Sequence, residues 1–300
     1  MRFGAVFPHA DFGNDRGAIR DFAQGVEALG FDHLITYDHV LSAEHVDRSP
    51  PLTGPYDETH EFHEPFVLFG YLGAVTDTID LVVGVLVAPQ RQTALIAKQA
   101  AEVQALSGGR LRLGLGTGWN WVEYESLGAD FERRGAVLDE QVAVLRQLWQ
   151  QRLVSFDGNF HRIDRATIRP LPDVRIPLWF GGYSPRALRR SARHGDGHLF
   201  GHLRASDLLA ATSLRALLAE GNRSAGPDFG IDAVTNTDAG ADVAGMCEIA
   251  TAWEAAGGTH LSVRTFELAP GRSNTRSVTE HLTLFERWRD ALQSCGVWRA

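Results

Sequence analysis

The sequence predicts a single α/β domain, residues 1–300, folded as a (β/α)8 TIM barrel of eight parallel strands alternating with helices. The 300-residue length suits such a barrel, which takes roughly 250 residues plus insertions. The pentapeptide Gly-x-x-His-Leu occurs at 30–34, 195–199 and 257–261, each time closing an amphipathic stretch and opening an apolar run. Apolar runs also alternate with helical periodicities along the whole chain, and parallel strands need such crossovers.

The repeated glycine suits the end of a helix. Glycine lacks the Cβ that clashes in the left-handed conformation, so it commonly follows the last helical residue. The pentapeptide therefore indicates a helix, its end and a following strand. In a β/α barrel, function lies at the C-terminal ends of the strands. The motif histidines, His33, His198 and His260, fall at strand starts, where we expect a structural role.

The expected strands are rich in β-branched and aliphatic residues and are bounded by Gly, Pro or Asp. They are 2–7, 33–37, 80–86, 111–116, 177–180, 197–200, 229–235 and 260–264. Apolar stripes near the 3.6-residue period predict helices between them. The clearest stripes are Ile19-Phe22-Val26-Leu29, Ile96-Ala100-Val103-Leu106, Leu138-Val142-Leu145-Trp149 and Val278-Leu282-Phe285-Leu292.

Two inserted loops interrupt this alternation. Residues 40–64 form a long polar stretch with several prolines, and residues 151–176 include the Asp157-Gly158 pair between alternating runs, which predicts a β-hairpin. Long loops in a compact domain are usually functional or assembly elements. Because the first loop leaves the barrel directly after the second strand, we expect it to cover part of the active site or to pack on a second subunit.

Composition narrows the function classes. A net charge of −8 and the lack of a basic block disfavour nucleic acid and anionic membranes as partners. No run approaches the 18 apolar residues of a membrane span. Cys247 and Cys295 form no Cys-x-x-Cys pair and do not resemble a disulfide framework. We therefore expect a cytoplasmic protein.

His39 is the strongest catalytic candidate, because it follows the second strand at the functional end of the barrel. An imidazole there could act as acid, base or hydrogen-bond donor, oriented by the adjacent carboxylate of Asp38. The alternative is a loop histidine bonded to a backbone carbonyl.

Two glycine-rich stretches could approach a ligand. Gly114, Gly116 and Gly118 alternate in the fourth strand, so a large flat molecule could reach the backbone, unless the small residues only relieve crowding inside the barrel. The run is not Gly-x-Gly-x-x-Gly, which argues against a nicotinamide site. The stretch Gly181-Gly182-Tyr183-Ser184-Pro185 predicts a strand end, a turn and a helix N-terminus suited to a phosphate.

The histidine- and glutamate-rich segment 58–64, near His45, invites a metal interpretation. His60 and His63 lack the closed ligand set of a zinc site, so we expect a solvated or interface loop and no metal.

Together, four stretches resemble the luciferase-like monooxygenase superfamily: Asp38-His39; residues 84–98; Ser107-Gly108-Gly109-Arg110 leading into residues 114–119; and Gly181-Gly182 with residues 195–197. The likeness covers most of residues 1–200. Within the superfamily the chain looks most like the branch that uses the deazaflavin coenzyme F-420, with FMN-dependent monooxygenases as close relatives.

The resemblance implies a cofactor ring in the C-terminal mouth of the barrel, with His39 beside its reactive face. It implies that Gly181, Gly182, Tyr183 and Ser184 hold the cofactor phosphate, and that Thr117 and Gly118 lie at the cofactor. It also implies a backbone bulge in the third strand, often with a non-prolyl cis peptide, which maps to Val85-Leu86 and supports the ring.

One position departs from the sugar-phosphate dehydrogenases of this branch, which have a glutamate where this chain has Trp119. The departure argues for a flat, apolar substrate pocket lined by Trp119 and Trp121. Three interpretations stay open: an F-420-dependent oxidoreductase, an FMN-dependent two-component monooxygenase, and a barrel that has lost cofactor and activity. The resemblance further implies a homodimer and a small-molecule substrate, with a flavin or F-420 reductase as a possible partner.

Overall fold

The computed structural model describes residues 1–203, 205–223, 229–236, 242–267 and 275–298. Eight parallel strands close into a barrel in the order β1-β10-β9-β8-β7-β4-β3-β2. They are β1 (Arg2–Val6), β2 (His33–Thr36), β3 (Asp80–Val87), β4 (Leu111–Gly116), β7 (Leu178–Gly181), β8 (Gly197–Phe200), β9 (Gly230–Asn236) and β10 (His260–Arg264). Each lies within one residue of its expected bounds at both ends, so the predicted barrel is confirmed.

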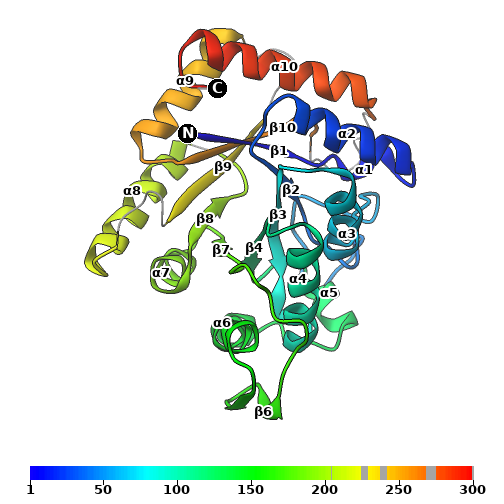
Figure 1. The fold of residues 1–300 in the computed structure, drawn as a ribbon, viewed down its shortest axis with the longest axis vertical. Coiled ribbons are helices and arrows are strands. Elements are labelled where there is room, and N and C mark those ends of the chain that lie inside the picture. The colour runs from blue at the N-terminus through cyan, green and yellow to red at the C-terminus, as the bar shows by residue number, and fades with distance from the viewer. Residues whose placement is uncertain (204, 224–228, 237–241, 268–274, 299–300) are drawn as a thin grey trace.

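Helices surround the barrel and connect its strands (Figure 1). They are α1 (His9–Phe12), α2 (Arg16–Ala28), α3 (Pro65–Val75), α4 (Thr93–Leu106), α5 (Trp121–Ser126), α6 (Arg134–Gln150), α7 (Pro185–His194), α8 (Ala205–Glu220), α9 (Val243–Ala255) and α10 (Val278–Ser294), with the short 3-10 helix η1 (Ala88–Gln90) after β3. The predicted stripes face the core except at Leu106, the last residue of α4, which is exposed; Phe22 and Val26 of α2 and Phe285 of α10 are fully buried. Their burial against the strands accounts for much of the stability of these helices.

The glycine caps follow the prediction in two copies of the pentapeptide. Gly30 and Gly257 have φ values of 84° and 96°, in the left-handed region. Gly195 has φ −87° and is not left-handed, so that part of the prediction is wrong. A Cβ at Gly195 would lie 2.8 Å from the Ser191 carbonyl oxygen, so a close approach of the backbone explains this glycine.

The second insertion contains the predicted hairpin. Strands β5 (Val154–Asp157) and β6 (Arg162–Ala166) pair antiparallel, and in Figure 1 they project beyond α6, away from the barrel. Glu140 of α6 holds the turn, because its carboxylate accepts hydrogen bonds from the N–H groups of Asn159, Phe160 and His161.

The N-terminal end of the barrel interior is filled by side chains. The Trp179 ring occupies space that Cβ atoms at Gly197 and Gly230 would take, and the Arg112 guanidinium lies 4.6 Å from its ring centroid. Further in, His33 Nε2 lies 3.0 Å from Asp232 and 2.9 Å from Ser262 Oγ, all three side chains being fully buried. Gly4 leaves the space for the His33 ring. The expected structural role of His33 agrees with this placement.

Arginines at the same end satisfy the carbonyls of helix C-termini. Arg110 donates to the Gly73 and Thr76 carbonyls at the end of α3, and Arg223 donates to Ala192 and Gly195 at the end of α7. Cations there also complement the negative end of the helix dipole. This end of the barrel is therefore built for stability.

The last two helices are joined covalently. Cys247 of α9 and Cys295 after α10 form a disulfide across 48 residues, with their Cα atoms 6.3 Å apart. The expectation drawn from their spacing is therefore wrong, because sequence separation does not show that α9 and α10 pack side by side. Among the described residues no helix is long and apolar enough to cross a membrane.

Candidate active site

A cavity of about 680 Å³ opens at the C-terminal end of the barrel strands. It is lined by Tyr37, Asp38, His39, Pro55, Tyr56, Gly84, Val85, Val87, Gly118, Trp119, Gly181, Gly182, Tyr183, Leu199, Gly201, His202, Asn236, Arg264 and Glu267. These residues come from the ends of β2, β3, β4, β7, β8, β9 and β10, from the segments that follow them and from the first insertion. A pocket of this size and place is where a barrel enzyme binds its ligands.

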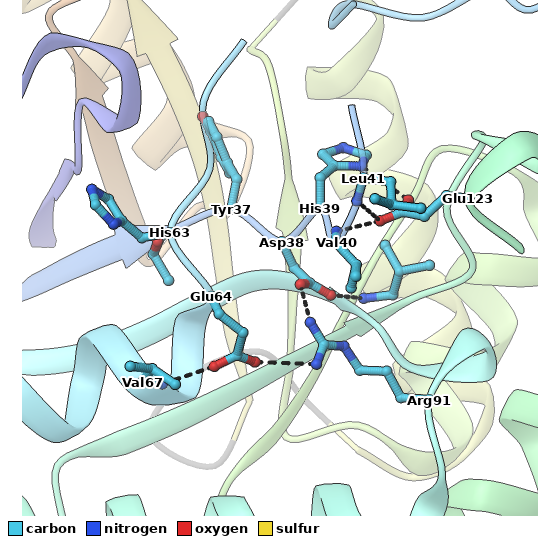
Figure 2. A network of polar contacts seen from close by, with 12 residues as sticks. Tyr37, Asp38, His39, Val40, Leu41, His63, Glu64, Val67, Arg91 and Glu123 are labelled. Atoms are coloured by element: carbon cyan, nitrogen blue, oxygen red, sulfur yellow. Dashed lines mark hydrogen bonds and ion pairs between the residues drawn. The ribbon is translucent and has the colours of Figure 1, made fainter. Parts of the chain in front are cut away.

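His39 lies where the sequence predicted it, directly after β2 and in the cavity wall. Its side chain is 8% exposed, and its Nδ1 lies 3.2 Å from Glu123 Oε2 (Figure 2). Glu123 stands in the first turn of α5, whose N-cap Asn120 accepts a hydrogen bond from the Glu123 N–H. The carboxylate that orients His39 is therefore Glu123 and not the adjacent Asp38, which corrects the sequence interpretation.

Glu123 is held at both oxygens. Oε1 accepts hydrogen bonds from the Val40 and Leu41 N–H groups, and Oε2 faces His39. Burial alone would raise the pKa of the Glu123 carboxyl, but the hydrogen bond and charge of His39 and the two backbone donors lower it below its ordinary value. Glu123 is thus ionised at neutral pH. Sequence reasoning missed it because it is 84 residues from His39.

Asp38 contacts other groups than His39. Its buried carboxylate accepts a hydrogen bond from the Val87 N–H at 2.9 Å and pairs with Arg91, which also pairs with Glu64 at 3.1 Å (Figure 2). Burial alone would lower the pKa of Arg91, but Asp38 and Glu64 raise it above the ordinary value. Asp38 therefore anchors the end of β3 and also lines the cavity.

The β3 bulge implied by the resemblance is present, shifted by one residue. The register of β3 against β4 changes between Val83 and Leu86, and the non-prolyl cis peptide joins Gly84 to Val85 rather than Val85 to Leu86. Val85 lines the cavity, whereas the Leu86 side chain is buried in the hydrophobic core. Of the two predicted ring-supporting side chains, only Val85 reaches the site.

The glycines of β4 divide between packing and the cavity. A Cβ at Gly114 would collide with the Val83 carbonyl oxygen, and one at Gly116 with the Val85 side chain, so both make room for the bulge. Gly118, with φ 63°, lines the cavity. Thr117 is absent from the lining, and its carbonyl accepts a hydrogen bond from the Tyr124 hydroxyl at 2.7 Å.

The turn after β7 has the predicted local structure. Gly182 has φ 117°, Ser184 is the N-cap whose side chain accepts a hydrogen bond from the Ala187 N–H, and Pro185 opens α7. Gly181, Gly182 and Tyr183 line the cavity, while Ser184 does not. The N-terminus of α7 thus faces the same end of the barrel as His39, with the dipole direction that favours an anion.

The aromatic wall differs from the predicted one. Trp119 lines the cavity, but Trp121 opens α5 and is absent from the lining, so the pairing of the two tryptophans is wrong. Tyr56 from the first insertion takes that place: its ring centroid lies 5.1 Å from His39 and 6.4 Å from Trp119. Phe62 packs behind it, 4.9 Å from His39. Segment 40–64 thus lines part of the cavity through Pro55 and Tyr56, which agrees with the expectation that it covers the site.

Polar groups that the sequence did not single out lie at the ends of β2, β9 and β10. Arg264 is 6% exposed, and its Nε donates to Asn236 Oδ1 at 2.8 Å; Tyr37 lies beside them. Burial raises the pKa values of Tyr37 and, more strongly, Tyr56, so both phenols are neutral. Their position at strand ends was available from the sequence, but which of them face the cavity was not.

Four other histidines that the sequence singled out make contacts away from His39. His60 Nδ1 lies 2.8 Å from Asp57, and the His63 N–H donates to His9 Nδ1. His198 Nδ1 bonds Ser191 Oγ at 2.7 Å, and His260 Nδ1 bonds Thr259 Oγ1 at 2.8 Å. In the part of the chain that the structure describes, no group of three His, Cys, Asp or Glu side chains could hold a metal ion.

Comparison with known proteins adds the family to this geometry. The sequence model of the luciferase-like monooxygenases matches residues 1–257. The chain belongs to the luciferase-like monooxygenase family. It is an oxidoreductase of that family, as its sequence predicted.

Three relatives show the range within this family. An uncharacterised protein of Mycobacterium tuberculosis is 35% identical over 200 residues, covering 65% of this chain and 69% of the relative. An F-420-dependent glucose-6-phosphate dehydrogenase of Nakamurella multipartita is 30% identical, covering 72% and 61%. The pyrimidine monooxygenase RutA of Escherichia coli is 36% identical, covering 44% and 38%.

A solved structure has the same fold over nearly the whole chain. The F-420-dependent secondary alcohol dehydrogenase, determined with an F-420–acetone adduct, superposes with a TM-score of 0.76 at 16% identity, covering 97% of this chain and 98% of that protein. At this identity the similarity establishes the shared fold of this luciferase-like chain.

Proposed function

We propose that this luciferase-like protein is a coenzyme F-420-dependent oxidoreductase that transfers hydride between the deazaflavin C5 and a small organic substrate. One observation carries the proposal: a carboxylate-held His39 lies in the same cavity as Val85 on the β3 bulge and the Gly181-Gly182 turn at the start of α7. The F-420-dependent dehydrogenases among the relatives support this cofactor.

The residues present fit such a cofactor. The cavity of about 680 Å³ is large enough for a tricyclic ring. Val85 would support one face of the ring, with Leu86 behind it in the core. The rest of the cofactor would lie against Gly118, next to Thr117, and against Gly181, Gly182 and Tyr183. Ser184 would cap the start of helix α7 beside the cofactor phosphate. Exposed Arg186 and Arg189, on the first turns of α7, suit an anionic polyglutamate tail.

When bound, a deazaflavin supplies a two-electron hydride donor or acceptor. The protein's part is position and proton transfer. His39 Nδ1 faces Glu123, so Nε2 is the atom that would hold or release a proton at the reacting substrate. Tyr56 and the loop around it would exclude water from that atom, and Asp38 would hold β3 in place.

The substrate would be amphiphilic. Trp119 and Tyr56 would contact a flat apolar body, as the sequence suggested. Arg264, Asn236 and Tyr37 would bind an oxygen-bearing end, which the apolar interpretation did not include. An aromatic or alicyclic alcohol or carbonyl compound with a second oxygen function has both parts.

An FMN-dependent two-component monooxygenase is the second candidate, favoured by the similarity to a monooxygenase. It would need a separate flavin reductase as partner. A barrel without cofactor or activity is the third. A homodimer is also proposed for any of them, and light scattering at several protein concentrations tests it.

Titration of the purified protein with F-420, its reduced form and FMN separates these candidates. We expect F-420 to bind more tightly than FMN. Micromolar FMN binding without detectable F-420 binding would favour the monooxygenase, and binding of none of the three would favour the barrel without cofactor.

A further inference from the structure

We infer that Glu123 sets the tautomer of His39, so that neutral His39 carries its proton on Nδ1 and presents the lone pair of Nε2 to the cavity. The inference comes from the hydrogen bonds that converge on one carboxylate, and only its catalytic consequence rests on the proposed function. It assigns Glu123 as a positioning residue that acts through His39.

The carboxylate has no proton to give. Glu123 is ionised, with a side chain 1% exposed, and an ionised carboxylate only accepts hydrogen bonds. Its Oε2 lies 3.2 Å from His39 Nδ1. Nδ1 must therefore be the donor, which leaves Nε2 as the acceptor in the neutral ring. Neutral His39 can then take a substrate proton at Nε2, and the protonated ring can return it.

The other oxygen makes the requirement specific for a carboxylate rather than an amide. Oε1 accepts from both the Val40 and the Leu41 N–H groups, directly after His39 in the chain. If residue 123 were glutamine, its amide oxygen would have to stay opposite these two donors. The amide NH2 would then face Nδ1, which could only accept. The proton would move to Nε2, and the ring would present a donor to the cavity.

The position of Glu123 bears on the sequence departure at Trp119. By the family resemblance, sugar-phosphate dehydrogenases have a glutamate at the position of Trp119. In this chain the carboxylate of Glu123, one helical turn later, reaches His39. The short helix α5, capped by Asn120, places Glu123 there. The chain thus has a carboxylate at the site while Trp119 lines the cavity.

Nitrogen-15 NMR of the protein without cofactor tests the inference directly. The twelve histidines would be labelled, and the His39 signals identified by their loss in His39→Gln. The spectra would be recorded at increasing pH until the His39 signals no longer change, so that they report the neutral ring. We expect Nδ1–H in the wild type, Nε2–H in Glu123→Gln, and Nδ1–H again in Glu123→Asp, which keeps an acceptor-only carboxylate.

Glu125→Gln is the matched control, because Glu125 lies on the same helix and is exposed. It should leave the His39 tautomer and turnover unchanged. With a substrate in hand, Glu123→Gln should lower kcat by about 10²–10⁴-fold and leave the cofactor Kd within about threefold.

Nε2–H in the wild type would overturn the inference, and so would retention of Nδ1–H in a folded Glu123→Gln protein. If Glu123→Gln does not fold by circular dichroism, the wild-type spectrum and Glu123→Asp still decide. Because these measurements need no cofactor, a tautomer that changes as expected in a protein that binds no F-420 would sustain this inference and reject the proposed function.

Discussion

The two ends of the barrel interior hold similar chemical groups in different settings. At the C-terminal end, His39 and Glu123 border a cavity of about 680 Å³. At the N-terminal end, His33 meets Asp232 and Ser262, but all three are fully buried, and both partners contact the same ring nitrogen, Nε2. In a catalytic triad, the hydroxyl nucleophile and the orienting carboxylate bind different ring nitrogens of the histidine. The comparison teaches that access and geometry, rather than residue types, separate the candidate site from a structural cluster.

Replacing His39 should produce the largest effect on function. For His39→Gln we expect turnover to fall by about 10²–10⁴-fold, because the acid or base is lost, with little change in cofactor affinity. Steady-state kinetics together with a cofactor titration would measure both. Wild-type turnover in the variant would show that His39 is only structural, like His33 at the other end of the barrel.

Replacing Asp232 should give the opposite result. Asp232→Ala leaves His33 and Ser262 without their buried acceptor, so the free energy of unfolding should fall by about 3–5 kcal/mol. Activity per folded molecule should stay within a few fold. Urea denaturation and active-site titration would show this; lost turnover at unchanged stability would instead assign the buried cluster a part in catalysis.

Acid should destabilise the fold through buried histidines. Burial lowers the pKa of His198 to about 3, and burial with the neighbouring His63 and His39 lowers that of His9 to about 3. Between pH 6.5 and 3 the unfolded chain therefore binds protons that the folded chain does not. The free energy of unfolding should fall by up to about 1.4 kcal/mol per pH unit for each histidine. His198→Gln should reduce this slope in urea titrations, and an unchanged slope would contradict the assignment.

A side chain at Gly182 should weaken cofactor binding by about tenfold, since a Cβ would enter the phosphate approach. The φ of 117° also makes Gly182→Ala costly for the fold. Gly128→Ala is the matched control, because Gly128 has φ 70° and open space around it outside the cavity lining. Equal cofactor Kd values in the two variants would place the phosphate elsewhere.

The smallest effect concerns the insertion at 40–64. Tyr56 lines the cavity, so bound cofactor should slow proteolytic cleavage of this segment by about threefold. Cleavage at one rate with and without cofactor, and at all protein concentrations, would show that the segment covers the cavity without responding to its contents.

The barrel could be predicted from the sequence because its signals are local. Strand composition, helical stripes and the capping glycines Gly30 and Gly257 each lie within a few residues. The candidate site depends on pairs distant in sequence, such as His39 with Glu123. Asp38 adjoins His39 in sequence. Successive side chains of an extended segment point in opposite directions, so the Asp38 carboxylate meets Val87 and Arg91. Trp121 likewise follows Trp119 closely but belongs to a helix.

The β3 bulge has a consequence for how this fold can diverge. Val85 fits into space left by Gly116 and Gly181, so a single substitution at either glycine collides with it. Tyr37 follows β2, and Asn236 and Arg264 end β9 and β10, so these three side chains fill no space reserved by a glycine, although Arg264 and Asn236 are hydrogen-bonded to each other. In the course of evolution, the first wall would resist substitution at its glycines, while the second could change where hydrogen-bonded partners change together.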